Sequence, residues 1–238
     1  MKTDTLKKML LMLLCVVSVN MTALGKELVS DVLPIADPYI LFYNDTYYAY
    51  GTSRADGFEV YSSKDMKSWE RSPRLALNKE DSYGDKWFWA PEVYYVEEDK
   101  KFYMFYSVEE HVCVATSDSP LGPFVQDEKK PTREEKGIDT SVFFDEDGKA
   151  YLYFVRFTNG NVIWCAELKD NLKEIKEETL TQCVEATEPW ELVFGKVVEG
   201  PSIVKQGGLY YMFYSANDFR SQDYAVGYAS SDSPFGPW

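Results

Sequence analysis

Four acidic residues are the residues of this sequence best placed to do chemistry. Asp37, Glu92, Asp139 and Glu199 each stand at or near the start of a strand-like run rich in aromatic and β-branched residues. A carboxylate beside apolar chain is costly to desolvate unless something pairs or uses it. Carboxylates that meet in a cleft either bind a hard cation or exchange protons with a substrate. Taken singly, each acid could be solvated in a loop, so their function depends on a fold that brings them together.

The acids belong to a unit that recurs along the chain. Each unit holds a short aromatic run, a polar turn, a second run of Tyr and Phe, and then a third run such as "VCVATS" or "YAVGYASS". The turns at Asn44-Asp45, 97–100, Asp147-Gly148 and Gly207-Gly208 are hairpin signals. The four units begin "DPYILFYNDTYYAYGTS" at Asp37, "PEVYYVEEDKKFYMFYS" at Pro91, "DTSVFFDEDGKAYLYFV" at Asp139 and "GPSIVKQGGLYYMFYSA" at Gly200.

Repeated units of three or four antiparallel strands are typical of the blades of a β-propeller. The first strand of each blade is innermost, so an acid at the start of each first strand would reach the same mouth of the central channel. A two-sheet β-sandwich is the alternative, but it does not explain why an acid and a hairpin recur together. We therefore predict an all-β propeller with about four blades in this chain, and four acids in register at one rim.

The first 25 residues have the plan of a secretory signal peptide. Three lysines precede an apolar run at 9–19, and Ala23-Leu24-Gly25 supplies small residues for cleavage. The apolar run is too short for a stable membrane span. We predict a signal peptide at 1–25, a single domain at 26–238, and a secreted or periplasmic protein.

The charge of the chain restricts its partners. The formal net charge is −14, which repels nucleic acid and anionic membranes, so we expect neither as a partner. A neutral carbohydrate fits better, and we expect a monomer. Cys113, Cys165 and Cys183 follow the signal peptide, and their spacing suggests neither a disulfide framework nor a zinc site. We predict no metal ligands among the residues of this chain.

Acids from distant units favour proton transfer over calcium binding, because a calcium cage usually draws several acids from one loop. Glycoside hydrolysis requires such a pair, in which one carboxylic acid protonates the leaving oxygen and a carboxylate activates water. Neighbouring acids also keep one member protonated near neutral pH. Trp89 could offer a flat face to a sugar ring, although a core tryptophan is the commoner outcome.

Four motifs resemble the blade signatures of glycoside hydrolase family 43. They are "IADPYIL", "WAPEV", "GIDTSVFFDEDGKAYLYF" and "VEGPSIVK", in this order, within about residues 31–238. The resemblance implies a five-bladed propeller of inverting enzymes that remove or cut L-arabinofuranose and D-xylose units of plant polysaccharides, with galactofuranose as a further candidate. It implies that Asp37 is the general base, Glu199 the general acid, and Asp139 the acid that tunes the pKa of Glu199 and orients it. Glu92 matches no catalytic position, so we assign it to hydrogen bonding in the substrate pocket or to structure.

The sequence departs from the family in the number of units. It contains four where the family has five, and it stops at Trp238, after the third run of the fourth unit. We therefore expect a C-terminally incomplete catalytic domain, with exposed apolar faces on the first and fourth blades. His111 does not match the family histidine that helps to hold a central metal. The resemblance implies no cofactor for the chemistry, and a structural calcium at the propeller centre only in the full-length protein.

The sequence is also compatible with functions other than hydrolysis. A non-catalytic glycan-binding propeller, an inactive fragment and a scaffold for protein partners are the alternatives. The retention of both Asp37 and Glu199 favours the hydrolase, since a binding protein would be free to lose either acid. Nucleophilic catalysis by Ser or Cys is disfavoured because the chain has a single histidine and no nucleophile-elbow motif.

Overall fold

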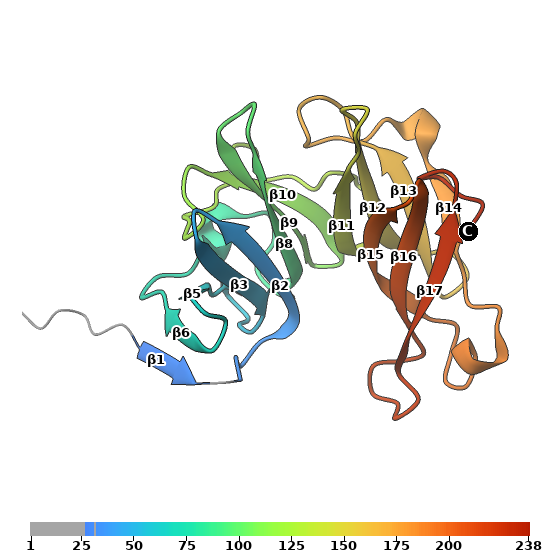
Figure 1. The fold of residues 1–238 in the computed structure, drawn as a ribbon, viewed down its shortest axis with the longest axis horizontal. Helices are drawn as coiled ribbons and strands as arrows, with labels where there is room; N and C mark the ends of the chain where they lie inside the picture. Colours follow the sequence, from blue (N-terminus) through green and yellow to red (C-terminus); the bar gives the residue numbers. More distant parts are fainter. Residues whose placement is uncertain (1–26, 31) are drawn as a thin grey trace, which may run out of the picture.

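The structure is a computed structural model that describes residues 27–30 and 32–238, so the predicted signal peptide lies outside the described residues. Four antiparallel sheets follow one another along the chain, from blue to red in Figure 1. None of the helices in the described residues is long and apolar enough to cross a membrane. An all-β architecture built from consecutive sheets is the predicted one, and it excludes the two-sheet sandwich.

The first sheet has the strand order β1-β6-β5-β3-β2, and the ribbon of β4 and β7 lies beside it. The second sheet has the order β10-β9-β8. The bounds in this half are β1 (Glu27–Ser30), β2 (Ala36–Tyr43), β3 (Thr46–Thr52), β4 (Gly57–Phe58), β5 (Tyr61–Ser63), β6 (Ser68–Arg71), β7 (Leu77–Asn78), the 3-10 helix η1 (Lys79–Asp81), β8 (Trp89–Val96), β9 (Lys101–Val108) and β10 (His111–Ser117).

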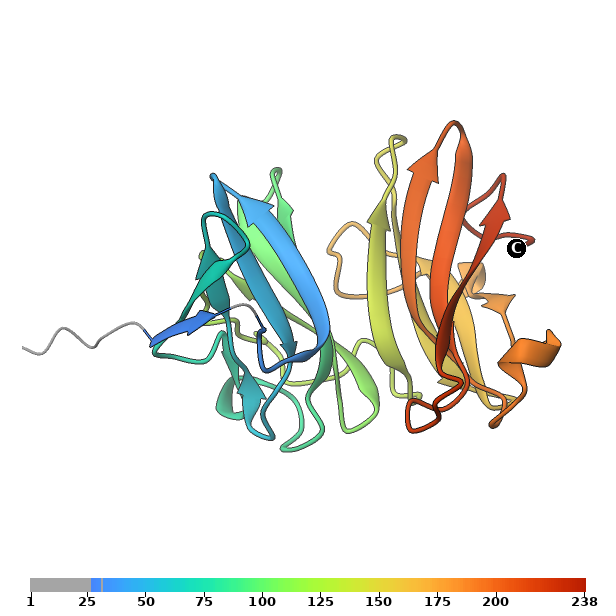
Figure 2. The same ribbon diagram turned by 60° about the horizontal axis from the view of Figure 1, so that its bottom comes forward.

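The third sheet has the order β11-β12-β13-β14, and the fourth has the order β15-β16-β17. Figure 2 shows these two sheets in one half of the ribbon and the first two sheets in the other. The bounds are β11 (Ile138–Phe144), β12 (Ala150–Phe157), β13 (Asn161–Glu167), η2 (Glu177–Thr179), β14 (Thr181–Val184), η3 (Pro189–Glu191), β15 (Val198–Gln206), β16 (Leu209–Ala216) and β17 (Ala225–Ser231).

The hairpins form where the turn chemistry predicted them. Asn44 and Asp45 connect β2 to β3 with φ values of 47° and 54°, and Gly207 and Gly208 connect β15 to β16 with 60° and 87°. Two consecutive residues with positive φ make the turn whose twist matches the strands. Glycine, asparagine and aspartate adopt this conformation more readily than other residues.

The hydrophobic core lies between successive sheets. Tyr50 and Met104 belong to the cluster that joins the first two sheets, Phe105 and Leu152 to the next, and Met212 to the cluster between the third and fourth sheets. The first strands also contact one another in series, β2 with β8, β8 with β11, and β11 with β15. This series places β2, β8, β11 and β15 along the centre, as expected for the inner strands of propeller blades.

The fourth sheet presents an apolar face to solvent. Val226 and Tyr228 of β17 are 72% and 68% exposed, and Phe213 of β16 lies beside Tyr228 on the same face. The first sheet exposes Phe42 of β2 at 56%. Exposed apolar side chains are therefore present on both the first and the fourth sheet.

Candidate active site

Each inner strand is interrupted at the same place by a β-bulge. The pairing of β2 with β3 shifts between Ala36 and Tyr39, and equivalent shifts occur in β8, β11 and β15. The first bulge residue has a left-handed backbone in every case, as G1-type bulges require. These residues are Asp37 (φ 47°), Ala90 (φ 46°), Asp139 (φ 53°) and Gly200 (φ 58°).

The bulges show that the prediction of four acids in one register is wrong for two of them. Asp37 and Asp139 occupy the bulge position itself. Glu199 precedes the bulge residue Gly200 by one position, and Glu92 follows Ala90 by two. The left-handed backbone disfavours most side chains, and in the fourth strand glycine adopts it while the neighbouring residue supplies the acid.

Asp37 lies at the end of a hydrogen-bond chain between the first and second sheets. Its Oδ2 accepts a hydrogen bond of 2.6 Å from the Thr52 hydroxyl. The Thr52 Oγ1 accepts in turn from the Ala90 N–H at 2.9 Å. The Asp37 side chain is solvent-exposed, so this carboxylate has a fixed direction and remains accessible to water.

Asp139 joins the third sheet to both of its neighbours. Its backbone N–H donates to Ser107 Oγ of β9 at 3.0 Å, and its Oδ2 accepts from the Gly200 N–H of β15 at 3.2 Å. Burial, followed by the negative charges of Glu199 and Asp37, raises the pKa of Asp139 to about 8. The negative charges of Glu199 and Asp37 both act on Asp139, which places the three predicted catalytic acids in one region.

Glu199 is held by two donors, one on each carboxylate oxygen. Asn161 Nδ2 donates to Oε2 at 3.0 Å, and the Tyr224 hydroxyl donates to Oε1 at 3.0 Å. Ser215, which pairs with Glu199 across β15 and β16, donates to the Tyr224 hydroxyl. Burial raises the pKa of Glu199, and the two donors oppose this effect by stabilising the carboxylate.

Asn161 and Tyr224 were missed in the sequence. Asn161 is the first residue of β13, and Tyr224 directly precedes β17. Both therefore stand at the start of the third strand of their blade, which runs in the same direction as the inner strand. Polar residues at the start of the third runs would have been the signal for finding them.

Glu92 lies in a tyrosine network between the inner strands. One of its carboxylate oxygens accepts from the Tyr94 hydroxyl, which accepts from the Val142 N–H at 2.9 Å. The Tyr39 ring lies 5.4 Å from the Tyr94 ring. Burial raises the pKa of Glu92 to about 7. These contacts join β2, β8 and β11, which favours the structural assignment of Glu92 over contact with substrate.

Trp89 is half-buried at the start of β8, and its backbone pairs with Ser107. Its neighbour at the bulge, Ala90, belongs to the hydrogen-bond chain of Asp37. The Trp89 ring stacks on Trp87, with 6.0 Å between the ring centroids and 13° between the planes. The structure thus brings Trp89 close to the backbone that carries the acids.

Metal-binding clusters were sought among the side chains of the described residues. No group of three or more His, Cys, Asp or Glu side chains in residues 27–30 and 32–238 is arranged to hold a metal ion. The single histidine, His111, forms a hydrogen bond of 2.8 Å between its Nδ1 and the Glu109 carbonyl.

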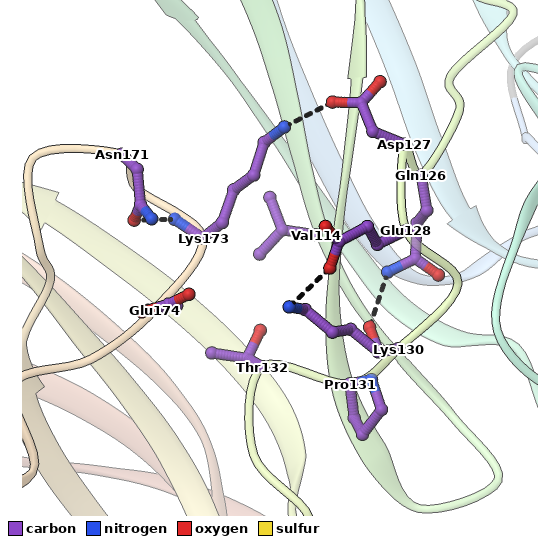
Figure 3. Close-up of a pocket in the computed structure, with 10 residues that line it drawn as sticks. All are labelled: Val114, Gln126, Asp127, Glu128, Lys130, Pro131, Thr132, Asn171, Lys173 and Glu174. Carbon is purple, nitrogen blue, oxygen red and sulfur yellow. Dashed lines mark hydrogen bonds and ion pairs between the residues drawn. The ribbon is translucent and has the colours of Figure 1, made fainter.

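A cavity of about 200 Å³ lies away from the predicted acids, between β10 and the loop after β13 (Figure 3). Two ion pairs lie within its lining. Lys130 bonds to Glu128 at 2.6 Å, and Lys173 bonds to Asp127 at 2.7 Å. None of the predicted site residues lines this cavity, so the candidate active site remains the region of the inner-strand bulges.

Several characterised or solved proteins are similar to this chain in sequence or in fold. An endo-1,4-β-xylanase from Bacteroides thetaiotaomicron is 58% identical, with a TM-score of 0.85 over 90% of this chain and 74% of that chain. A β-D-galactofuranosidase from Aspergillus niger is 28% identical over 85% of this chain and 62% of its own length. A β-xylosidase from Xylanibacter ruminicola is 33% identical over 60% and 53%. The chain thus spans less than two thirds of these two curated relatives.

The sequence profile of Glycosyl hydrolases family 43 matches residues 33–238. The match includes all four inner strands, with Asp37, Asp139 and Glu199. Together with the likeness to the solved xylanase, it supports the predicted propeller. The chain belongs to glycosyl hydrolase family 43.

Proposed function

We propose that the protein is an inverting glycoside hydrolase that removes L-arabinofuranose or D-xylose residues from plant polysaccharides or their oligosaccharides, with galactofuranose as a further candidate. The observation that carries this proposal is the contrast between two carboxyl groups. Asp37 is exposed and fixed by one hydroxyl donor, which suits a general base. Glu199 is half-buried and its pKa is raised, which suits a general acid.

The reaction is a single displacement. Asp37 accepts a proton from a water molecule as the water oxygen forms a bond to the anomeric carbon. The bond from that carbon to the leaving oxygen breaks on the opposite side, and Glu199 gives its proton to the leaving oxygen. The attack comes from the face opposite the leaving group, so the configuration at the anomeric carbon inverts.

Asp139 influences this reaction through Glu199. It accepts a hydrogen bond from Gly200, the residue that follows the acid, and its pKa is raised partly by the charge of Glu199. Interacting carboxyl groups share protons as a unit and do not all ionise at neutral pH. Asp139 thus helps to keep a proton on the cluster, and it fixes the backbone beside Glu199.

The test compares two substrates with leaving groups of different quality. Glu199→Gln should nearly abolish cleavage of arabinan or xylan, whose leaving alcohol must be protonated, and should reduce cleavage of activated aryl pentosides far less. Asp37→Asn should reduce both equally, because neither substrate then receives an activated water. Glu146→Gln is the matched control, since Glu146 is 90% exposed at a hairpin turn.

Two outcomes would overturn parts of this proposal. Equal losses on both substrates for Glu199→Gln would exclude its role as proton donor. Retained configuration in the first product, read by proton NMR, would exclude single displacement. The alternative of a non-catalytic glycan-binding propeller predicts that the unaltered protein binds arabinan or xylan without releasing sugar.

Residues 1–25 would direct export to the periplasm or the medium, and N-terminal sequencing of the exported protein should begin at residue 26. Residues 26–238 would form one catalytic domain that acts as a monomer on neutral carbohydrate. The acid–base chemistry requires no cofactor, and a structural calcium is expected only in a full-length protein.

A further inference from the structure

Trp87 is an exposed tryptophan whose contacts in the fold explain neither its exposure nor its backbone. Its side chain is 46% exposed, and its φ of 60° lies in the left-handed region. A large residue pays a steric cost there, because its Cβ approaches the following carbonyl oxygen. Strained residues persist where the surroundings hold them, and they gather at ligand sites. The exposed and strained Trp87 is therefore a candidate for contact with a ligand.

The ring of Trp87 belongs to a pair of stacked tryptophans whose backbone adjoins that of the predicted acids. It stacks on Trp89 with an interplanar angle of 13° and a centroid distance of 6.0 Å. Trp89 adjoins Ala90, which belongs to the hydrogen-bond chain of Asp37. It also pairs with Ser107, whose hydroxyl accepts from the backbone of Asp139. The two stacked rings thus lie on the segment that leads into the inner strand β8, and Trp87 is the more exposed of the two.

The chemistry of this pair suits a sugar ring. Parallel, offset indole rings present flat faces of negative potential, which attract the weakly positive C–H groups on the apolar face of a saccharide. The Lys86 ammonium lies over the Trp87 ring, 4.4 Å from its centroid. A sugar that stacks on this face would displace the exposed ammonium, which could then donate hydrogen bonds to the sugar hydroxyls. A neutral ligand is compatible with the strongly acidic chain, whereas an anionic ligand is not.

We propose that Trp87 binds a neighbouring sugar unit of the polysaccharide, next to the unit that is cleaved. This proposal rests on the proposed function, and it deepens that function by naming a binding position for a polymeric substrate. Trp89 would contact the unit at the acids, and Trp87 the adjacent unit. The protein would therefore prefer chains over single aryl sugars, and Trp87 would set that preference.

The first experiment measures kcat/KM for Trp87→Ala on arabino- and xylo-oligosaccharides and on aryl pentosides. We expect about a tenfold loss on the oligosaccharides, mostly through KM, which corresponds to one lost aromatic stacking contact. The loss on aryl pentosides should stay below about twofold. Phe42→Ala is the matched control, because Phe42 is also an exposed aromatic in contact with a second ring, that of Tyr47 at a centroid distance of 4.7 Å. It lies five residues beyond Asp37 on β2, or about 17 Å along the strand.

A second variant separates binding from folding. Trp87→Gly removes the ring and also relieves the left-handed strain, so it should keep or raise the melting temperature while losing the same affinity. A lower melting temperature for Trp87→Gly would show that the ring supports the fold and would overturn the proposal. Equal losses on oligosaccharides and aryl pentosides would also overturn it, as would a loss of equal size in Phe42→Ala.

Affinity electrophoresis in gels that contain arabinan or xylan distinguishes failure of this proposal from failure of the proposed function. If the protein binds these polymers without cleaving them, the hydrolase proposal fails, and weaker retardation of Trp87→Gly would still support the binding of a sugar unit by Trp87. If the protein cleaves the polymers and Trp87→Gly is retarded as strongly as the unaltered protein, only the proposal for Trp87 fails. If it neither binds nor cleaves them, both proposals are refuted.

Discussion

Replacing Tyr224 by phenylalanine should move the pH dependence of the reaction. The substitution removes only the hydroxyl that donates to Glu199 Oε1 at 3.0 Å. That bond stabilises the carboxylate, so its loss raises the pKa of Glu199. The general acid must be protonated to work, and the alkaline limb of kcat/KM should therefore move to higher pH.

The size of the change follows from the geometry. A hydrogen bond to a charged group contributes about 1.5–3 kcal/mol, and 1.36 kcal/mol corresponds to one pKa unit. Tyr224 is 39% exposed, so water replaces part of the lost interaction and the lower end of the range applies. We expect the alkaline limb to move up by about one pH unit, and the activity on its acidic side to fall less than about tenfold.

The assay is a profile of kcat/KM against pH on a natural oligosaccharide, whose leaving group requires the proton. Tyr228→Phe is the matched control, because this tyrosine lies on β17 with its side chain 68% exposed on the outer face. A limb that stays in place, or moves to lower pH, would refute the idea that Tyr224 controls the ionisation of Glu199. A uniform loss at all pH values would indicate that Tyr224 only supports the loop.

Three further predictions concern stability and positioning. Asp139→Asn should stabilise the fold increasingly between about pH 4 and pH 8, because the folded carboxyl, with its pKa of about 8, retains a proton that the unfolded chain releases. In denaturant unfolding, the difference in unfolding free energy between the variant and the unaltered protein should rise by at most about 1.4 kcal/mol per pH unit. A gain in stability that does not depend on pH would contradict this. Gly160→Ala should lower the melting temperature by several degrees, since a Cβ there would lie 2.0 Å from the Lys196 carbonyl oxygen and φ is 87°; an unchanged melting curve would contradict it. Thr52→Val should lower kcat about 10- to 100-fold on natural and aryl substrates alike, by releasing Asp37; a loss confined to one substrate would refute the positioning role.

The blades were predictable because their signals are local. Two signals depend on neighbouring positions only. One is the alternation of apolar residues along a strand, and the other is the pair of turn residues between strands, such as Asn44-Asp45 and Gly207-Gly208. Because each repeat unit forms one sheet, the order of the units along the chain predicted the order of the sheets. The packing of each inner strand on the next followed from the architecture itself.

The register of the site was harder to predict because acids are a poor guide to backbone geometry. Aligning the units on their acids set Glu199 and Glu92 beside Asp37 and Asp139, which the bulges contradict. The second bulge residue would have been the better marker. Proline, which cannot donate to a strand ladder, stands there in three of the four strands, and Thr140 in the other.

Their places at the start of the third runs mark Asn161 and Tyr224 as candidates, but the hydrogen bond from Asn161 to Glu199 could not be predicted from a pattern within one unit. Asn161 comes from the third sheet and Tyr224 from the fourth, and they meet only because adjacent blades pack together. Contacts of this kind depend on the angle between sheets and on side-chain rotamers. Neither property leaves a regular spacing in the sequence.

The recurring bulge gives the protein four copies of one backbone position, the left-handed first residue of the bulge. The residue type at each copy varies independently of the others. Asp37 and Asp139 place carboxylates at two of these positions, and Ala90 places only a methyl group at a third. Gly200 occupies the fourth, where the preceding residue, Glu199, supplies the carboxylate. The backbone is the same in each case, so a single codon change is enough to add or remove an ionisable group at the mouth. A duplicated blade can thus gain a catalytic role without any change of fold. Ala90 marks the position at which a further acid could be introduced by design.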